Sequence, residues 1–188
     1  MNKKVILGYV DLTNVSHDYC WYTVVTQYNY EEKYAENILE AIQGTNIAPL
    51  ISEIYLPFKY IQEERNVGKK KVKKVRKIKG SYSSYVFVKC ILTETLWNLL
   101  RTTTGAAVIL TTGGIPTPIE QKQIDLIKEH QSPEGFTEEE WIDYAQQLED
   151  KYHITDETTF SKEALENIIA NSKWSQGDDE DGLQIKTT

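Results

Sequence analysis

Apolar residues follow two different periods along residues 1–131, and each period predicts a set of elements. Runs of aromatic and β-branched residues are typical of strands, whereas apolar residues repeated every three or four positions are typical of amphipathic helices. Strands are predicted at Trp21–Gln27, at Ser52–Glu63 with an interruption at Pro57, at Tyr85–Leu92 and at Ala106–Thr111. Helices are predicted at residues 31–43, from the cap Thr93 to Gly105, and at residues 119–129.

The order of these elements predicts the fold class. A strand, a helix and two strands are followed by a helix, a strand and a final helix. Two split β-α-β units in this order form a ferredoxin-like α+β fold, in which helices cover an antiparallel sheet. We therefore expect residues 20–131 to form one such domain, preceded by a flexible leader over residues 1–19.

The last third of the chain has a different pattern. Ser132-Pro-Glu-Gly135 indicates a linker, and Thr137 with Glu140 has the spacing of a helix capping box. Apolar residues at helical spacing follow the box, and acidic residues follow those. We expect an acidic helical hairpin appended to the domain over residues 132–175 and a disordered acidic tail over residues 176–188.

Charge is divided unevenly along the chain, which has a net charge of −7. Residues 1–131 contain 17 Lys and Arg against 13 Asp and Glu, whereas residues 132–188 contain 4 against 15. Such an asymmetry indicates a basic part and an acidic part with different partners. One hypothesis is that the acidic segment shields the basic one, and the alternative is that it is a solubilising extension.

Signatures of catalysis and of metal binding are missing from the sequence. It contains no Walker A, G-x-G-x-x-G, G-x-S-x-G or H-E-x-x-H motif, so we expect neither an enzyme nor a bound cofactor or metal. Cys20 and Cys90 are too few for a disulfide framework or a zinc site, and we expect buried thiols. No apolar run is long enough to span a membrane and no signal peptide is recognisable, so we expect a cytoplasmic protein.

The densest charge in the chain is a basic run between Lys69 and Lys79, with Tyr82 and Tyr85 close behind it. Lys and Arg neutralise phosphates and give salt-dependent binding to nucleic acids, and the alternative is a solvated hairpin tip. RNA-recognition domains share the ferredoxin-like fold and stack bases on the aromatic residues of a similar strand. An RNA-binding module is therefore one candidate function. The residues of the run that we expect to contact nucleic acid are Lys69, Lys70, Lys71, Lys73, Lys74, Arg76 and Lys77.

Several segments, taken in order, resemble the amino-terminal domain of the NusG family of transcription elongation factors. Trp21-Tyr22 with Val24-Val25 resembles the first strand of that family, and Tyr82-x-x-Tyr85-Val-Phe-Val resembles its Phe-Pro-Gly-Tyr-Val-x-Val strand. Trp97-x-Leu-Leu-Arg-Thr-Thr-Thr-Gly105 resembles a segment that usually reads Trp-x-x-Val-Arg-x-Thr-Pro-Gly. Gly114-x-Pro-x-Pro118 resembles the loop that leads into the third helix of the family.

The resemblance implies a non-enzymatic function in transcription. Members of the family bind RNA polymerase at the clamp helices of its largest subunit, reach the opposite lobe of the DNA cleft and can touch the non-template DNA strand. The residues that correspond to the polymerase-binding positions are Trp21, Tyr22, Tyr82, Tyr85 and Leu110. For Trp21, Tyr22 and Leu110, an ordinary place in the core is the alternative.

The resemblance also implies a second nucleic-acid contact, but it does not include the second domain of the family. Arg101, Thr102 and Thr103 correspond to the segment that faces upstream DNA, and a polar helix end is the alternative for them. The family normally carries a small KOW-type barrel, but no pattern of that type follows residue 131. Contacts with Rho or with a ribosomal protein, which that barrel makes, are therefore without support in this chain.

Overall fold

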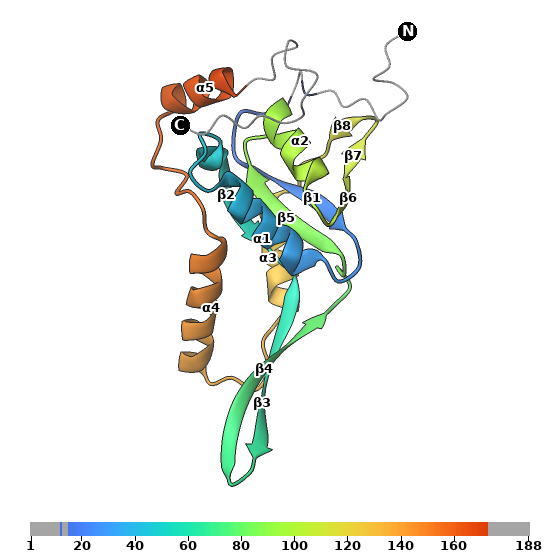
Figure 1. Ribbon diagram of the computed structural model, residues 1–188, viewed down its shortest axis with the longest axis vertical. Coiled ribbons are helices and arrows are strands. Elements are labelled where there is room, and N and C mark those ends of the chain that lie inside the picture. Colours follow the sequence, from blue (N-terminus) through green and yellow to red (C-terminus); the bar gives the residue numbers. More distant parts are fainter. Residues whose placement is uncertain (1–11, 13–14, 173–188) are drawn as a thin grey trace.

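The centre of the molecule is a four-stranded antiparallel sheet with the strand order β2-β5-β1-β6. The computed structural model describes residue 12 and residues 15–172. Helix α1 (Glu31–Ile42) follows the first strand of the sheet and α2 (Glu94–Thr102) follows the third, which is the ferredoxin-like arrangement. The predicted α+β fold class is thus confirmed. The strands of the sheet are β1 (Cys20–Thr26), β2 (Ile51–Tyr55), β5 (Tyr85–Cys90) and β6 (Ala106–Ile109) (Figure 1).

Both faces of the sheet are covered by helices. Side chains of α1 and α2 share the main core with one face, and α3 (Gln121–His130) packs on the other. Because side chains alternate along a strand, Tyr22 enters the main core while Trp21 joins a smaller cluster with Ile124 and Ile127 of α3. The main core and this smaller cluster therefore lie on opposite sides of β1.

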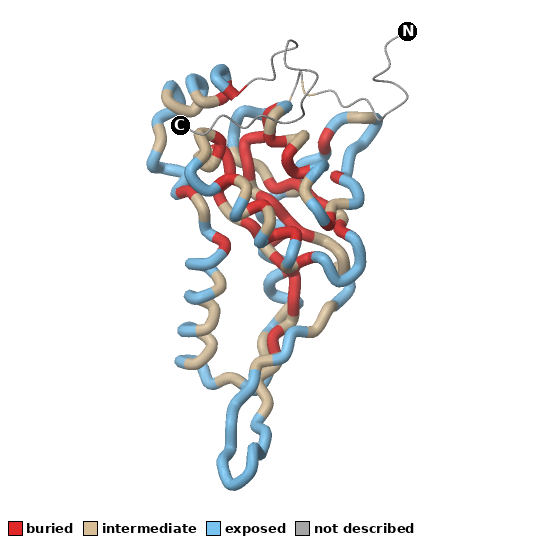
Figure 2. The backbone as a smooth tube through the Cα atoms, in the orientation of Figure 1, coloured by how far each residue is buried: buried red, intermediate tan, exposed pale blue. Residues whose placement is uncertain are grey.

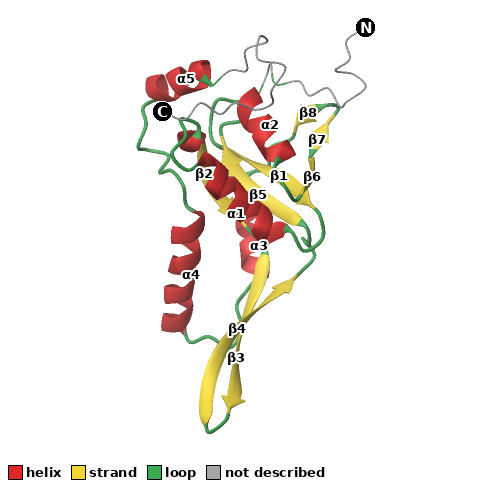
Figure 3. Ribbon diagram, in the orientation of Figure 1, coloured by secondary structure: helices red, strands yellow, loops and turns green. Residues whose placement is uncertain are grey.

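A long hairpin leaves the sheet between β2 and β5. Strands β3 (Phe58–Val67) and β4 (Lys70–Lys79) pair along their whole length and project away from the domain (Figures 1 and 3). The strand predicted over residues 52–63 is therefore two strands, since Pro57 has no N–H to give to a ladder. Gly68, with φ +63°, supplies the left-handed conformation that the tight turn needs. The basic run is the return strand of this hairpin.

The linker after α3 docks along β3 like a short additional strand. Glu134 forms a parallel bridge with Ile61, and its N–H donates to the carbonyl of Tyr60 at 3.1 Å. The N–H of Gln62 donates in turn to the carbonyl of Glu134 at 2.8 Å. Gly135 has φ +77°, and a Cβ there would lie 2.1 Å from the carbonyl oxygen of Gln62. Only glycine fits this close approach of two backbones.

Helices α4 (Glu138–Tyr152) and α5 (Lys162–Asn171) pack on the domain, and the predicted capping box of Thr137 is present at the start of α4. α4 begins beside the hairpin and runs from there back along the domain, and α5 lies at the opposite end of the molecule from the hairpin (Figure 1). The expected appended hairpin differs from this arrangement, because Tyr152 of α4 and Ile169 of α5 belong to the same core as the sheet. Figure 2 shows the buried positions concentrated in the sheet and the segments around it.

The 3-10 helix η2 (Ala48–Leu50) and the paired strands β7 (Thr111–Thr112) and β8 (Ile115–Pro116) complete the described fold. The edge of the sheet is less buried than expected. The strand predicted as buried over residues 106–111 is shorter, and Val108 is 52% exposed because β6 is an edge strand.

The two cysteines are free thiols that face each other across β1 and β5. Cys90 is buried as expected, and Cys20 is half-buried. Burial raises the pKa of the Cys90 thiol, so this thiol stays protonated and behaves as a small apolar side chain.

In the described part of the chain, no helix combines the length and apolar character needed to cross a membrane. The predicted tail over residues 176–188 lies outside the described residues, as does most of the predicted leader over residues 1–19.

Candidate functional site

An aromatic face lies on the α3 side of the sheet; this name denotes Trp21, Tyr55, Tyr82, Tyr85 and Phe87. Tyr85 and Phe87 are two residues apart on β5, and Tyr55 lies opposite Phe87 on β2. The ring centroid of Phe87 lies 6.1 Å from that of Tyr55, 6.4 Å from that of Tyr82 and 6.2 Å from that of Tyr85. The rings therefore form one continuous cluster.

Exposure across the aromatic face rises from its floor to its rim. Trp21 and Phe87 are each 1% exposed and form the floor. Tyr55, Tyr82 and Tyr85 are half-buried above it. Desolvation raises the pKa of Tyr55 to about 12, so its hydroxyl is neutral and can donate a hydrogen bond. An apolar floor with half-exposed tyrosines is typical of a site that anchors a protein partner.

Polar and cationic groups surround the floor of the aromatic face. The indole N–H of Trp21 donates to Oε1 of Gln121 at 2.8 Å, which satisfies its only polar group. The Nζ of Lys128 lies 5.8 Å from the Trp21 ring centre and 5.0 Å from that of Tyr55, and the Nζ of Lys89 lies 5.9 Å from Trp21. Lys89 is also paired with Glu157 at 2.6 Å, so Lys128 supplies the positive charge at the edge of the aromatic face.

Some of the residues predicted to contact a polymerase are accessible on the aromatic face, and others are buried. Tyr82 and Tyr85 are accessible on the aromatic face, and Leu110, 38% exposed, follows β6 on the same side by strand alternation. The prediction of a contact is wrong for Trp21, which is 1% exposed and supports these residues from below. The prediction is wrong for Tyr22, which is 1% exposed and points into the main core on the other side of the sheet.

The basic run occupies β4 and the turn before it, and every residue of the run predicted to contact nucleic acid is exposed. Carboxylates from three different elements nevertheless lie within ion-pair distance of part of the run. The pairs are Lys71–Glu64 at 3.8 Å, Lys73–Glu140, Arg76–Glu63 at 2.7 Å and Lys77–Glu32 at 2.7 Å.

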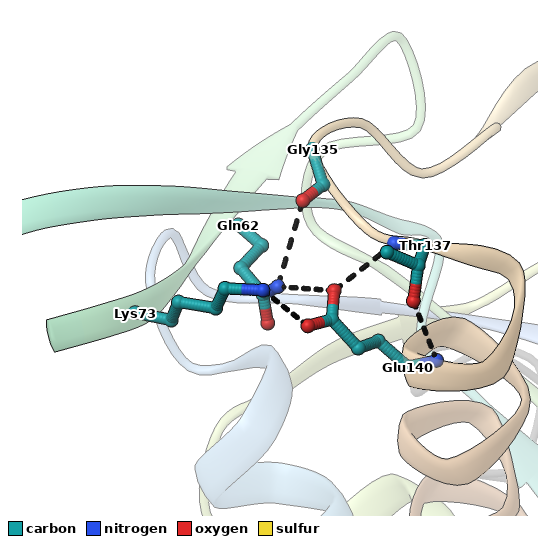
Figure 4. A network of polar contacts seen from close by, with 5 residues as sticks. All are labelled: Gln62, Lys73, Gly135, Thr137 and Glu140. Atoms are coloured by element: carbon teal, nitrogen blue, oxygen red, sulfur yellow. Dashed lines mark hydrogen bonds and ion pairs between the residues drawn. The ribbon is translucent and has the colours of Figure 1, made fainter.

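Glu140 is the centre of a polar network that joins α4 to the hairpin (Figure 4). Its carboxylate accepts hydrogen bonds from the Nζ of Lys73, from the Nε2 of Gln62 at 2.8 Å and from the N–H of Thr137 at 3.0 Å. The hydrogen bond from Lys73, followed by that from Thr137, lowers the pKa of Glu140 to about 2. The same contact raises the pKa of Lys73, so both groups are charged at neutral pH.

The end of α2 presents one cation and two hydroxyls whose protons already form hydrogen bonds within the helix. Thr102 Oγ1 donates to the carbonyl of Asn98 at 2.6 Å, and Thr103 Oγ1 donates to that of Leu99 at 2.6 Å. A phosphate oxygen needs a donor, so the hydroxyls of Thr102 and Thr103 cannot serve it in this geometry. Arg101 is exposed, and its guanidinium has donors beyond the one that bonds to Asn98 at 3.2 Å.

Sequence reasoning missed several residues of these surfaces. Phe87 is two residues after Tyr85 in a clear strand, so the alternation of side chains could have found it. Tyr55 could have been found only by pairing β2 with β5, and Lys128 only by docking α3 on the sheet. Among the described residues, no group of three or more His, Cys, Asp or Glu side chains is placed to hold a metal ion.

Comparisons with known proteins match the part of the chain that carries the aromatic face. A family model described as "Transcription termination factor nusG" matches residues 19–128. The transcription termination/antitermination protein NusG of Halalkalibacterium halodurans is 27% identical over 138 residues, which cover 71% of this chain and 72% of that protein. The protein of the same name from Staphylococcus epidermidis is 26% identical over 131 residues, covering 68% and 69%.

A solved structure of NusG from Thermotoga maritima, described as "Domain interaction in Thermotoga maritima NusG", is also similar to this chain. The two chains are 28% identical in sequence. The similarity covers 58% of this chain and 55% of that one, with a TM-score of 0.46.

Proposed function

Since the chain belongs to the NusG family, whose model spans more than half of it, we propose that it is a transcription elongation factor that binds RNA polymerase through the aromatic face. The family is one of non-enzymatic transcription factors, and the relatives named above are termination/antitermination proteins. A role in transcription follows from this membership. The polymerase contact, its residues and its effect on elongation are the proposed part.

The observation that carries the proposal is the graded exposure of the aromatic face. Tyr82 and Tyr85 stand half-exposed above a buried floor of Trp21 and Phe87. The tip of a helical hairpin, such as the clamp coiled coil of the largest polymerase subunit, is bound best by aromatic anchors over an apolar floor. Leu110 extends this surface at its edge with 38% of its area exposed.

A factor of this kind would act by bridging two parts of the polymerase. Binding the clamp with the aromatic face and the opposite lobe of the cleft with another surface would favour the closed state, because a ligand stabilises the state that offers it more contacts. Arg101 would add a contact to the non-template strand near the cleft. Pausing, termination or antitermination would change as a result of that shift in population.

We expect Tyr82→Ala to weaken binding to bacterial core RNA polymerase by about tenfold or more, since an aromatic anchor typically contributes at least 1–2 kcal/mol. The matched control is Tyr28→Ala, because Tyr28 is 72% exposed and lies outside the aromatic face. Binding is measured by fluorescence anisotropy, with an isolated clamp coiled-coil fragment as competitor. Equal affinities of the two variants, or binding that the fragment does not compete, would contradict the proposal.

The RNA-binding module is the competing hypothesis, and the same variants test it. Tyr82 and Tyr85 would then stack on the bases of single-stranded RNA, so Tyr82→Ala would lower RNA affinity in the absence of polymerase. Binding to free RNA without binding to polymerase would favour this alternative. Residues 132–172 form α4 and α5 and no KOW-type barrel.

A further inference from the structure

The two faces of the β3–β4 hairpin differ in what surrounds their basic side chains. Directly paired residues of an antiparallel ladder point to the same side, so the pairs Tyr60–Lys77 and Glu64–Lys73 define one face and the pair Glu63–Lys74 defines the other. We call the first the inner face, because Tyr60 is 6% exposed and lies against α4. The second is the outer face.

Every basic residue of β4 on the inner face has a carboxylate partner. Lys73 bonds to Glu140 of α4, and Lys71 lies 3.8 Å from Glu64 of β3. The other partners come from the start of α1. Lys77 lies 2.7 Å from Glu32 and Lys79 lies 3.1 Å from Glu31. The inner face is therefore close to neutral and is directed at the rest of the protein.

The outer face keeps its positive charge. It carries Arg65, Lys70, Lys74 and Arg76 together with one carboxylate, that of Glu63, which lies 3.6 Å from Arg65 and 2.7 Å from Arg76. A fifth cation of this face, Lys59, is paired with Glu134 of the docked linker. Within residue 12 and residues 15–172, neither Lys70 nor Lys74 has an ion-pair partner. The side chains of Arg65, Lys70, Lys74 and Arg76 are all exposed.

The composition of the outer face distinguishes between classes of nucleic acid. Single strands are bound by stacking their bases on aromatic side chains. The residues of β3 and β4 on the outer face include no aromatic one, so apart from the Glu63 carboxylate the face offers only cations and aliphatic side chains. Cations spread along a ribbon suit the regularly spaced phosphates of a duplex. Strands of 10 residues make this ribbon about 30 Å long.

We infer that the outer face of the β3–β4 hairpin is a docking surface for the phosphate backbone of double-stranded DNA, with Arg65, Lys70, Lys74 and Arg76 as the contacting residues. The inference rests on the proposed role of the chain in transcription, where duplex DNA lies next to the polymerase. A two-stranded ribbon also fits the wide major groove of B-form DNA, whereas the major groove of an RNA duplex is too narrow for it.

The inner face contributes by fixing the direction of the hairpin. The Glu140 network and the docked linker at Glu134 and Gly135 hold β3 against α4 (Figure 4). A ribbon held in this way presents its outer cations without first losing much conformational freedom, which reduces the entropic cost of binding. Lys73, Lys77 and Lys79, whose partners lie on α4 and α1, are thus positioning residues, and the four exposed cations of the outer face are contact residues.

The test compares two triple variants with the same change in charge. The outer variant combines Lys70→Gln, Lys74→Gln and Arg76→Gln, and the inner variant combines Lys71→Gln, Lys73→Gln and Lys77→Gln. Affinity for a 30-base-pair DNA duplex is measured by fluorescence anisotropy from about 50 to 200 mM salt. We expect the slope of log affinity against log salt to fall by about two to three units in the outer variant and by less than about one in the inner variant.

Equal losses in the two variants would overturn the inference, because they would indicate an undirected charge effect. Tighter binding of the wild-type chain to single-stranded DNA or to an RNA duplex than to the DNA duplex would overturn it as well. Thermal unfolding of each variant verifies that the fold is intact. If the inner variant unfolds early, Lys71→Gln alone is compared with Lys74→Gln alone.

Polymerase binding is measured on the same variants and separates this inference from the proposed function. The outer variant should bind core RNA polymerase without DNA as tightly as the wild-type chain, since the aromatic face is unchanged. A wild-type chain that binds polymerase but no duplex contradicts the outer-face inference alone. A chain that binds the duplex but not polymerase contradicts the proposed function alone.

Discussion

Glu140 has two roles at the scale of a single residue. Its position at the third residue of α4 completes the capping box with Thr137. Its carboxylate also reaches across to Lys73 and Gln62 of the hairpin. The spacing in the sequence predicts the first role. The second depends on where α4 docks, because the partners are more than 60 positions away along the chain.

The lowered pKa of Glu140 predicts a pH-dependent contribution to stability. A carboxyl whose pKa falls from about 4.5 in the unfolded chain to about 2 in the folded one stabilises the fold above pH 4.5. This contribution is lost as the pH falls from about 4.5 toward 2. We therefore expect Glu140→Gln to be less stable than the wild-type chain at pH 7, and the difference in unfolding free energy to shrink below pH 4.5.

Urea unfolding at pH 7, 4 and 3 measures that difference. The control is Glu139→Gln, on the neighbouring residue of the same helical turn, which has no ion pair or hydrogen-bonded side chain among the described residues. Its stability relative to wild type should not converge in the same way. A Glu140→Gln difference that is the same at all three pH values would show that the network does not form in solution.

At the scale of elements, α4 is attached to the hairpin by a cluster of aromatic rings. The ring of Trp141 lies 6.1 Å from that of Tyr60 and 5.3 Å from that of Phe136. Tyr144, one turn further along, lies 5.3 Å from Tyr60. The apolar residues in this helix predicted that it has a buried side. They did not predict that β3 would be the surface that buries it.

We expect Trp141→Ala to lower the unfolding free energy by about 2 kcal/mol, since it removes a half-buried aromatic side chain from a packed cluster. Ile142→Ala, next to it on the same helix but 62% exposed, should cost less than about 0.5 kcal/mol. Urea unfolding of both variants checks the difference. Similar effects would contradict the docking of α4 on the hairpin.

For the molecule as a whole, charge is arranged along the longest dimension. The basic hairpin projects at one end, the start of α4 lies near it and α5 lies at the other end (Figure 1). The first turn of α4 carries Glu138 and Glu139 in addition to Glu140. Their negative potential extends over about 10 Å at 0.1 M salt and should therefore reach the hairpin. This arrangement gives the shielding hypothesis a specific set of residues.

We expect the double variant Glu138→Gln with Glu139→Gln to bind duplex DNA several-fold more tightly than the wild-type chain at about 50 mM salt. The gain should disappear near 0.5 M salt, where charges are screened within a few ångströms. Glu163→Gln with Glu166→Gln on α5 makes the same change in charge far from the hairpin and should have little effect. Equal gains from both pairs would leave only net charge as the cause, and the acidic segment would then be a solubilising extension.

The sequence by itself determined the features that depend on neighbours along the chain. The two periods of apolar residues gave the order of strands and helices, and that order implied the ferredoxin-like sheet. The sequence also predicts the caps at Thr93 and Thr137 and the break at Pro57, because these features have local physical causes. The residues that resemble the NusG family lie in sequence order, and the family match over residues 19–128 covers the same part of the chain.

Only the tertiary structure decided which side of each element meets which surface. Alternation places Trp21 and Tyr22 on opposite faces of β1, but it does not say that one face lies beneath tyrosines and the other beneath α1 and α2. The basic run likewise alternates without indicating which lysines meet Glu32 or Glu140. These choices depend on contacts between residues far apart in sequence, and local spacing contains no information about which distant element covers a given face.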